Sequence, residues 1–372
     1  TFTTADGEEK VYGLPNTVTF NAGYSYSFTF VLNAATKVAD GMTNCYIVAP
    51  GAELTFLVSR AYTYENKAFT TTLHTGGEYT GAFTAEVVWA DALVISGTPT
   101  VTGSGNTAEV TVKTNASVSG NAVVKICRSD NGETVWSYHI WVTDYTGAET
   151  YTNTYTFSSK QYEFIFMDRN LGATFAGTGT GLGTGLFYQW GRKDPFPATL
   201  EPDDTQLGGG SFTAVKTSDV NGTVANAIKN PGVFYFGNSG TGDWLYVSNN
   251  TLWGYASDGG TKTIYDPCPS GWRVPVNPDR DEYRSPWKGF TSSNGGTWNN
   301  GYSWGTNAAY PAAGFRSNYS GSILDAGTAG CYWSASPNGN IYALDLYFIS
   351  GGVYKSSYAA RIGGRLVRCV QE

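Results

Sequence analysis

Apolar residues in this 372-residue chain mostly alternate with Thr, Ser or Asn, and long windows rich in Ala, Glu, Lys and Leu are missing. The run YSYSFTFVL at 24–32 is typical, with aromatic residues on one side and hydroxyl residues on the other. Successive side chains of a β-strand point to opposite faces, so this pattern predicts half-buried strands. The fold class we expect is mainly β with a loop-rich α+β part.

Composition and length suggest more than one domain. Aromatic residues make up 15% of the chain, charged residues 14%, and glycine is abundant, which favours short strands and many turns. The length exceeds what a single core usually fills. We expect terminal strands of a β-sandwich that lacks its beginning at 1–37, a β-sandwich at 38–150, and a loop-rich domain at 151–372. Short helices are expected at 186–190 and 224–229.

Charge and hydropathy narrow the range of partners. The formal net charge is −7 and no Lys/Arg cluster is present, which argues against nucleic acid as a partner. No window approaches the roughly 18 consecutive apolar residues of a membrane span. We therefore expect no membrane span in this chain.

The five cysteines, at 45, 127, 268, 331 and 369, are too dispersed for a zinc site of the CxxC type. No metal and no cofactor are expected. Cys268 and Cys369 both lie beside tightly turned, strand-like sequence, which makes a disulfide between them plausible. The alternative, five reduced and buried cysteines, stays open.

Two parts of the first 150 residues resemble known surface proteins. The segments NCYIV at 44–48, GNAVV at 120–124 and WSYHIWVTD at 136–144 look like a module of secreted fimbrillin-family proteins of gut Bacteroidales. ADG at 5–7 with TFNAGYSY at 19–26 resembles the closing strands of a fimbrillin β-sandwich. The resemblance implies that a preceding domain is absent from this chain.

Residues 167–370 are similar to the Fibrobacter-type major-paralogue domain, which shares features with C-type-lectin-like and sulfatase-modifying folds. Six ordered motifs carry the resemblance: MDRNLGA at 167–173, GLFYQWGRKDPFP at 185–197, DPCPSGWRVP at 266–275, PAAGFR at 311–316, YWSAS at 332–336 and GRLVRCV at 364–370. The resemblance implies a C-type-lectin-like C-terminal domain with a role in adhesion.

Catalytic patterns are present but lack their context. GYSWG at 301–305 fits the nucleophile-elbow pattern around Ser303, yet both histidines, His74 and His139, precede it, whereas the hydrolase order needs one after it. The glycine-rich stretch at 177–183 lacks the lysine of a P-loop. Acidic residues at 201, 203, 204, 279, 281 and 282 are interpreted as solvated loops rather than calcium ligands. Cys331 has no cysteine nearby in sequence to form the redox pair of sulfatase-modifying enzymes. We expect no catalytic residues and no enzyme activity.

Residues 294–304, NGGTWNNGYSW, combine aromatic rings with amides, the groups that hold glycans. The candidate ligand-binding residues are Trp298, Asn299, Asn300, Tyr302 and Trp304. The alternative is that these aromatic side chains fill the core of a domain with few helices.

The expected function is that of a cell-surface adhesion protein, a fimbrial (pilus) tip subunit that binds a host or bacterial surface ligand. Its expected partners are other pilus or surface-assembly subunits and a glycan or protein ligand. The expected location is extracellular, on the fimbrium or associated with the outer membrane. The alternative is a glycan-binding component of a surface polysaccharide-capture system.

Overall fold

The computed structural model describes residues 2–3, 9–10, 36–37, 43–58, 79–91, 93–178, 181–198, 209–237, 242–256, 260–278 and 283–372. Two compact units divide the chain, Thr1–Leu32 and Asn33–Glu372. In the first, β1 (Phe2–Thr3) pairs with β2 (Glu9–Lys10); the strands expected between 11 and 33 lie outside the described residues. The chain is mainly β, with 42% strand and 4% helix, which confirms the coarse fold class.

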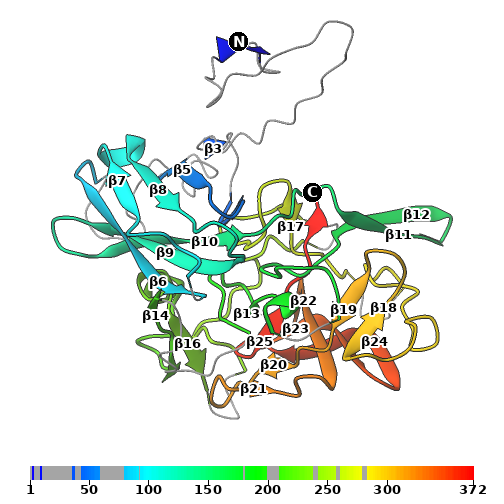
Figure 1. Cartoon of the computed structure of the whole chain (residues 1–372). Coiled ribbons are helices and arrows are strands. Elements are labelled where there is room, and N and C mark those ends of the chain that lie inside the picture. Colours follow the sequence, from blue (N-terminus) through cyan, green and yellow to red (C-terminus); the bar gives the residue numbers. More distant parts are fainter. Residues whose placement is uncertain are drawn as a thin grey trace, which may run out of the picture. The chain divides into compact units, whose positions relative to one another are not determined.

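A β-sandwich opens the second unit (Figure 1). Its two sheets share one apolar core, in which Phe56 of one sheet contacts Tyr46 and Tyr138 of the other. The strand order of the first sheet is β14 (Gly209–Gly210), β6 (Phe83–Ala90), β9 (Gly120–Arg128), β10 (Thr134–Val142), β4 (Cys45–Val48). The order of the second is β3 (Thr36–Lys37), β5 (Glu53–Leu57), β8 (Glu109–Lys113), β7 (Thr100–Thr102), and a 3-10 helix, η1 (Gly105–Thr107), precedes β8.

The central strand β10 is buried along its whole length, not half-buried. Trp136, Tyr138 and Ile140 face the sandwich core, whereas the alternate residues, such as Trp141, face the C-terminal part. Alternation therefore holds, but both faces are covered. The sheet that contains β10 is the middle layer of three.

The C-terminal part is built from short strands and long loops (Figure 1). One sheet has the order β11 (Thr150–Phe157), β12 (Lys160–Met167), β26 (Val370–Gln371), β17 (Trp272–Arg273). The largest has the order β21 (Ile323–Leu324), β20 (Phe315–Arg316), β25 (Gly364–Leu366), β22 (Ala329–Asn338), β23 (Tyr342–Ile349), β24 (Gly352–Ala360), and β13 (Phe187–Gln189) also pairs with β25. Two separate two-stranded sheets complete the C-terminal part: β15 (Thr213–Lys216) with β16 (Val233–Phe236), and β18 (Gly301–Ser303) with β19 (Ala309–Pro311).

Of the two short helices expected, one is confirmed and one is wrong. Helix α2 (Val224–Lys229) is capped by Thr223, whose hydroxyl accepts from the Asn226 amide. Residues 186–190 instead contain strand β13. Gly185 and Gly191, with φ of +86° and +84°, flank it and break any helix, while pairing with β25 fixes the extended backbone.

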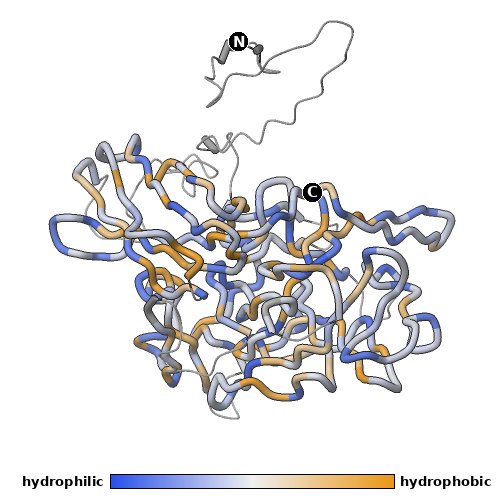
Figure 2. The backbone as a smooth tube through the Cα atoms, viewed as in Figure 1, coloured by the Kyte–Doolittle hydropathy of each residue, from blue (hydrophilic) through white to orange (hydrophobic). Residues whose placement is uncertain are grey.

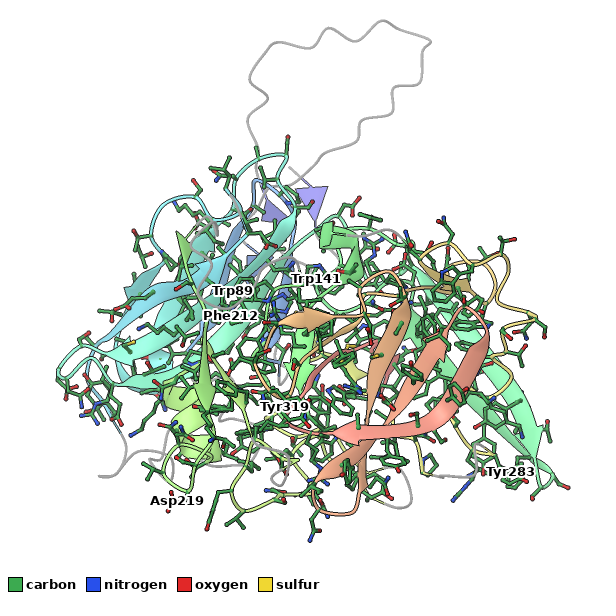
Figure 3. The ribbon with its side chains drawn as sticks, turned by 90° about the horizontal axis from the view of Figure 1, so that it is seen from below. Trp89, Trp141, Phe212, Asp219, Tyr283 and Tyr319 are labelled. Carbon is green, nitrogen blue, oxygen red and sulfur yellow. A yellow bond between two sulfur atoms is a disulfide. The ribbon has the colours of Figure 1, made fainter. Side chains whose placement is uncertain are left out.

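The sandwich and the C-terminal part share a core. A single apolar cluster joins Trp89, Val123 and Trp141 of the sandwich to Met167, Phe212 and many further residues of the C-terminal part. Trp89, Trp141 and Phe212 lie near one another in Figure 3. Figure 2 shows hydrophobic colour along the strands of the middle sheet and hydrophilic colour at the hairpin tips. Residues 43–150 and the C-terminal part are therefore packed as one body rather than as separate globules.

Polar side chains of the sequence motifs hold the loops of the C-terminal part. Arg368, which is buried, donates to Asn170 Oδ1 at 2.8 Å, Met167 O at 3.2 Å and Ala309 O at 2.6 Å. Arg316, also buried, donates through Nη1 to Gly321 O at 2.7 Å. Loop carbonyls have no ladder partner and are costly to bury alone, so these guanidinium groups substitute for regular secondary structure.

Candidate ligand-binding surface

The segment 294–304 is held against the largest sheet by the β18–β19 pair. Gly301 has φ +146°, and a Cβ added there would lie 2.2 Å from the Tyr310 carbonyl oxygen, so only glycine fits. Asn300, just before it, has φ +49°. The Tyr302 hydroxyl donates to Ser350 O at 2.6 Å, which ties the segment to the turn between β23 and β24.

The aromatic rings of this segment belong to a large aromatic cluster. Trp304 stacks on Phe290 with ring centroids 4.3 Å apart, and its indole N–H donates to Thr291 O at 2.9 Å. Trp298 meets Tyr302 and Phe348 edge to face, at 5.0 and 6.2 Å. Such pairs prefer these geometries and add to the stability of the core.

The structure places the five candidate residues at different depths. Tyr302 is 2% exposed and forms part of the core, because its ring packs beneath Trp298 and Trp304. Trp298 and Trp304 are half-buried, and Asn299 and Asn300 are exposed. The accessible groups are therefore the two amides and the outer edges of two indoles.

Exposed tyrosines form a second set of surface aromatic groups, which the sequence analysis missed. Six tyrosine side chains in the C-terminal part are at least 38% exposed: Tyr246, Tyr283, Tyr319, Tyr342, Tyr354 and Tyr358. Tyr342 and Tyr358 contact each other edge to face at 5.5 Å, and Tyr354 stacks on the half-buried Tyr347 at 5.8 Å. By contrast, eight of the eleven tryptophans are fully buried. Tyrosine tolerates exposure because its hydroxyl stays hydrated while the ring offers contact area.

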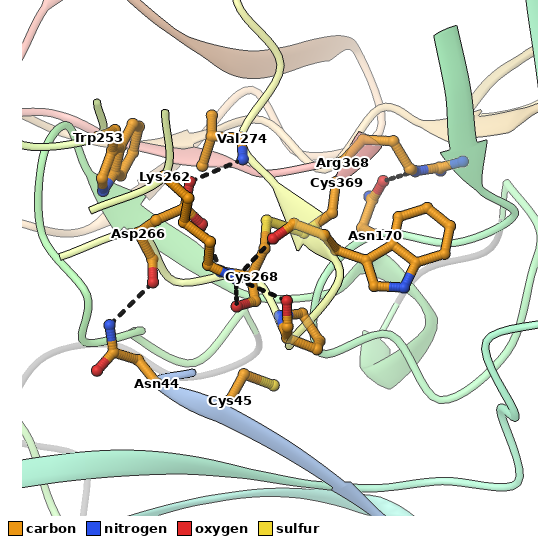
Figure 4. Close-up of a disulfide and its surroundings, with 12 residues drawn as sticks. Asn44, Cys45, Asn170, Trp253, Lys262, Asp266, Cys268, Val274, Arg368 and Cys369 are labelled. Carbon is orange, nitrogen blue, oxygen red and sulfur yellow. Dashed lines mark hydrogen bonds between the residues drawn. A yellow bond between two sulfur atoms is a disulfide. The ribbon is translucent and has the colours of Figure 1, made fainter. Parts of the chain in front are cut away.

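Cys268 and Cys369, the pair indicated by the sequence, form a disulfide in the structure (Figure 4). It ties the end of the chain to the turn at 266–275. The buried Lys262 ammonium beside it donates to the carbonyls of Cys268, Pro269 and Trp272 at 2.8, 2.7 and 2.6 Å. The three other cysteines are buried and free, and burial raises the pKa of the Cys331 thiol to about 12.

A buried lysine, serine and aspartate meet between the middle sheet and the C-terminal part. The Lys193 ammonium contacts Ser137 and Asp194, and all three side chains are buried. A serine beside a lysine is a potential nucleophile, but this pair lies inside the core, where a substrate has no access. We assign it to packing between the middle sheet and the C-terminal part.

His139 also lies in this buried layer. Its Nε2 lies 2.9 Å from Asn121 Oδ1, its ring stacks on Trp141, and burial lowers its pKa to about 3. The imidazole is therefore neutral at ordinary pH. Ser303 is exposed and donates to Gly305 O within its own turn, whereas His139 lies in the core.

The described residues include neither a metal-binding cluster nor a helix that could span a membrane. Among the described residues, no group of three or more His, Cys, Asp or Glu side chains is arranged to hold a metal ion. The acidic positions at 201–204 and 279–282 and the residue His74 lie outside the described residues. The helices of the described segments are too short and too polar to cross a membrane.

No family model, curated protein or solved structure matches this chain.

Proposed function

We propose that this chain is a cell-surface adhesion protein, a fimbrial tip subunit whose C-terminal part carries the ligand-binding surface. The observation that carries the proposal is the pair of exposed amides, Asn299 and Asn300, beside the half-buried indoles of Trp298 and Trp304. Aromatic side chains that are partly exposed in the free protein are characteristic of recognition surfaces for glycans and proteins. The exposed tyrosines of the C-terminal part, such as Tyr354, form a second aromatic surface that the test below separates from this one.

An extracellular location, on the fimbrium or at the outer membrane, is part of this proposal. Disulfides persist in oxidising compartments and are rare in the cytosol. The Cys268–Cys369 bond closes a long stretch of chain, and the remaining cysteines are buried away from oxidants.

We also propose a C-type-lectin-like fold for residues 151–372. Short strands, long loops held by buried arginines, and the pairing of β12 with β26 support it, because that pairing brings the two ends of this part together. Other pilus or surface-assembly subunits are the proposed structural partners.

The alternative function is a glycan-binding component of a surface polysaccharide-capture system. The same surface would serve it, since exposed amides beside indole rings suit soluble polysaccharides as well as cell-bound glycans. Binding to soluble polysaccharide without attachment to cells would favour this alternative.

A glycan array probed with the intact chain tests the proposal. The intact chain is required because a fragment starting at 155 would expose the apolar cluster shared by Trp141 and Met167. We expect binding that Asn299→Ala weakens at least about tenfold, since a buried ligand hydrogen bond is worth about 1.5 kcal/mol. Trp298→Ala should act in the same direction.

Tyr354→Ala is the matched control, because this exposed side chain lies on the opposite face of the β23–β24 hairpin from Phe348, which Trp298 contacts. Loss of binding in Tyr354→Ala alone would move the site to the tyrosines. Absence of binding to any glycan or to any cell-surface protein would contradict the proposed function.

A further inference from the structure

Strand β11 is an open edge of its sheet. Among the described strands it pairs only with β12, and the hairpin that they form projects from the body of the C-terminal part (Figure 1). The two-residue turn between them contains Ser158 and Ser159, with φ of +49° and +66°, as a type I′ turn requires. Such a turn fixes Phe157 and Lys160 as a hydrogen-bonded pair and so fixes which residues face the open edge.

The backbone groups on the open edge belong to the threonines of β11. In an antiparallel ladder, hydrogen-bonded and non-hydrogen-bonded pairs alternate, so Thr150, Thr152, Thr154 and Thr156 point their N–H and C=O groups away from β12. The neighbouring strand supports this assignment, because Met167, the partner of Thr150, donates its N–H away from β11 to Cys369 O at 3.1 Å.

This edge lacks the usual protection against strand pairing. Native edges are blunted by Lys, Pro or a bulge, and the other long edge strand of the described residues, β24, has both Lys355 and a bulge. Strand β11 has none of these, and Thr152, Thr154 and Thr156 are exposed. Among the described residues, the outward backbone groups of β11 accept one long hydrogen bond, from Asn307 Nδ2 to Thr150 O at 3.4 Å.

The sequence of the edge identifies its occupant. Residues 150–156 read TYTNTYT, a palindrome centred on Asn153. When a palindromic strand pairs antiparallel with a second copy, each residue meets one of its own kind. The register centred on Asn153 places Thr152 opposite Thr154 and Tyr151 opposite Tyr155, and it makes the outward-facing threonines the hydrogen-bonded pairs.

We propose that two copies of this chain associate through antiparallel pairing of their β11 edges, in the register centred on Asn153. Thr–Thr and aromatic cross-strand pairs are favourable. Strand β11 contains no charged residue, so no like charges meet across the two-fold axis. The aromatic face of the hairpin is already covered, since Tyr283 stacks on Phe157 and the Asn153 amide donates to Pro286 O at 2.7 Å. The open parts of the hairpin are therefore this edge and the threonine face beside it. Because the hairpin projects, the bodies of the two copies lie at opposite ends of the joined strands.

Cysteine cross-linking tests the register. Thr152→Cys and Thr154→Cys place thiols on the exposed face, opposite each other in the proposed pair, at the roughly 5.5 Å Cα separation that a disulfide accepts. A mixture of the two variants should form disulfide-linked dimers at least about tenfold faster than either variant alone, because pairing holds the two sulfur atoms at high effective concentration. Equal rates in the mixture and in each variant alone would overturn the register.

Sedimentation of the intact chain over a concentration series tests the association itself. Thr154→Pro removes an outward N–H without removing a bond to β12, so this variant should stay monomeric at concentrations where the wild type dimerises. Thr154→Val keeps the N–H and the β-branched side chain and should dimerise as the wild type does. A wild-type chain that is monomeric at every concentration, or a Thr154→Pro variant that dimerises like Thr154→Val, would overturn the proposal.

Discussion

Replacing Cys268 and Cys369 together with alanine is expected to lower the free energy of unfolding by about 5 kcal/mol. The bond joins residues separated by 101 positions. Closing a loop of about 100 residues removes about 4.7 kcal/mol of conformational entropy from the unfolded chain at 25 °C in the chain-entropy relation. Both cysteines are fully buried, so the lost sulfur contacts add to this loss.

Urea unfolding of the intact chain, followed by tryptophan fluorescence, measures the change. Most of the tryptophans are buried, so their emission reports loss of the core. The unlinked chain should also show a larger dependence of the unfolding free energy on urea, because its unfolded state exposes more surface. Cys331→Ala is the matched control, since Cys331 is buried but forms no disulfide. This variant should lose about 1 kcal/mol of unfolding free energy. A double variant that loses no more stability than Cys331→Ala would refute the reasoning.

Three further changes test the packing. Gly314→Ala should destabilise by about 3 kcal/mol or more in urea unfolding, because a Cβ there would lie 1.9 Å from Leu324 O, whereas Gly339→Ala, at the same φ of +73° but with open space around it, should cost about 1 kcal/mol. Burial lowers the pKa of His139 to about 3, so the unfolded chain binds one more proton than the folded chain and stability falls as pH drops below about 6.5. The difference in unfolding free energy between wild type and His139→Gln should therefore shift by about 2 kcal/mol between pH 7.5 and pH 5. A difference that stays constant over this range would contradict burial of a neutral imidazole. Lys262→Met leaves three buried carbonyls without their donor and should cost about 3 kcal/mol in the same unfolding assay, while an unchanged midpoint would contradict the assigned role.

Period-two alternation indicates most strands of the sandwich correctly, because the lengths of these strands and the turns between them follow that pattern. Residues 134–142, TVWSYHIWV, consist mostly of β-branched and aromatic residues and form β10, with Gly132 in the turn before it at φ +71°. Its burial on both faces was not predictable from the strand alone, since it depends on residues such as Asp194 and Ala173 that arrive from far along the chain. The apolar segment LVIS at 93–96 favours a strand by composition but does not form one, because Leu93 has φ +62° and Ile95 forms only an isolated bridge.

The candidate site was harder to predict because the sequence does not say which aromatic rings are covered. Trp298 and Tyr302 occur in an apparently polar loop, yet both rings contact Phe348 of the sheet, Trp298 edge to face and Tyr302 at a tilt. The exposed tyrosines of β24, Tyr354 and Tyr358, are strand-forming aromatic residues like those of the core, so residue type alone does not mark them as exposed. Tertiary packing, rather than local pattern, decides which set faces solvent.

Attachment of protein-coated beads to glycan-bearing cells tests the proposed adhesive function most directly. Beads coated with the intact chain should attach, beads with Asn299→Ala should attach at least about tenfold less, and beads with Tyr354→Ala should behave like the wild type. Attachment by the wild-type chain no greater than that of uncoated beads, on cells that present the glycans and proteins of host and bacterial surfaces, would contradict the account.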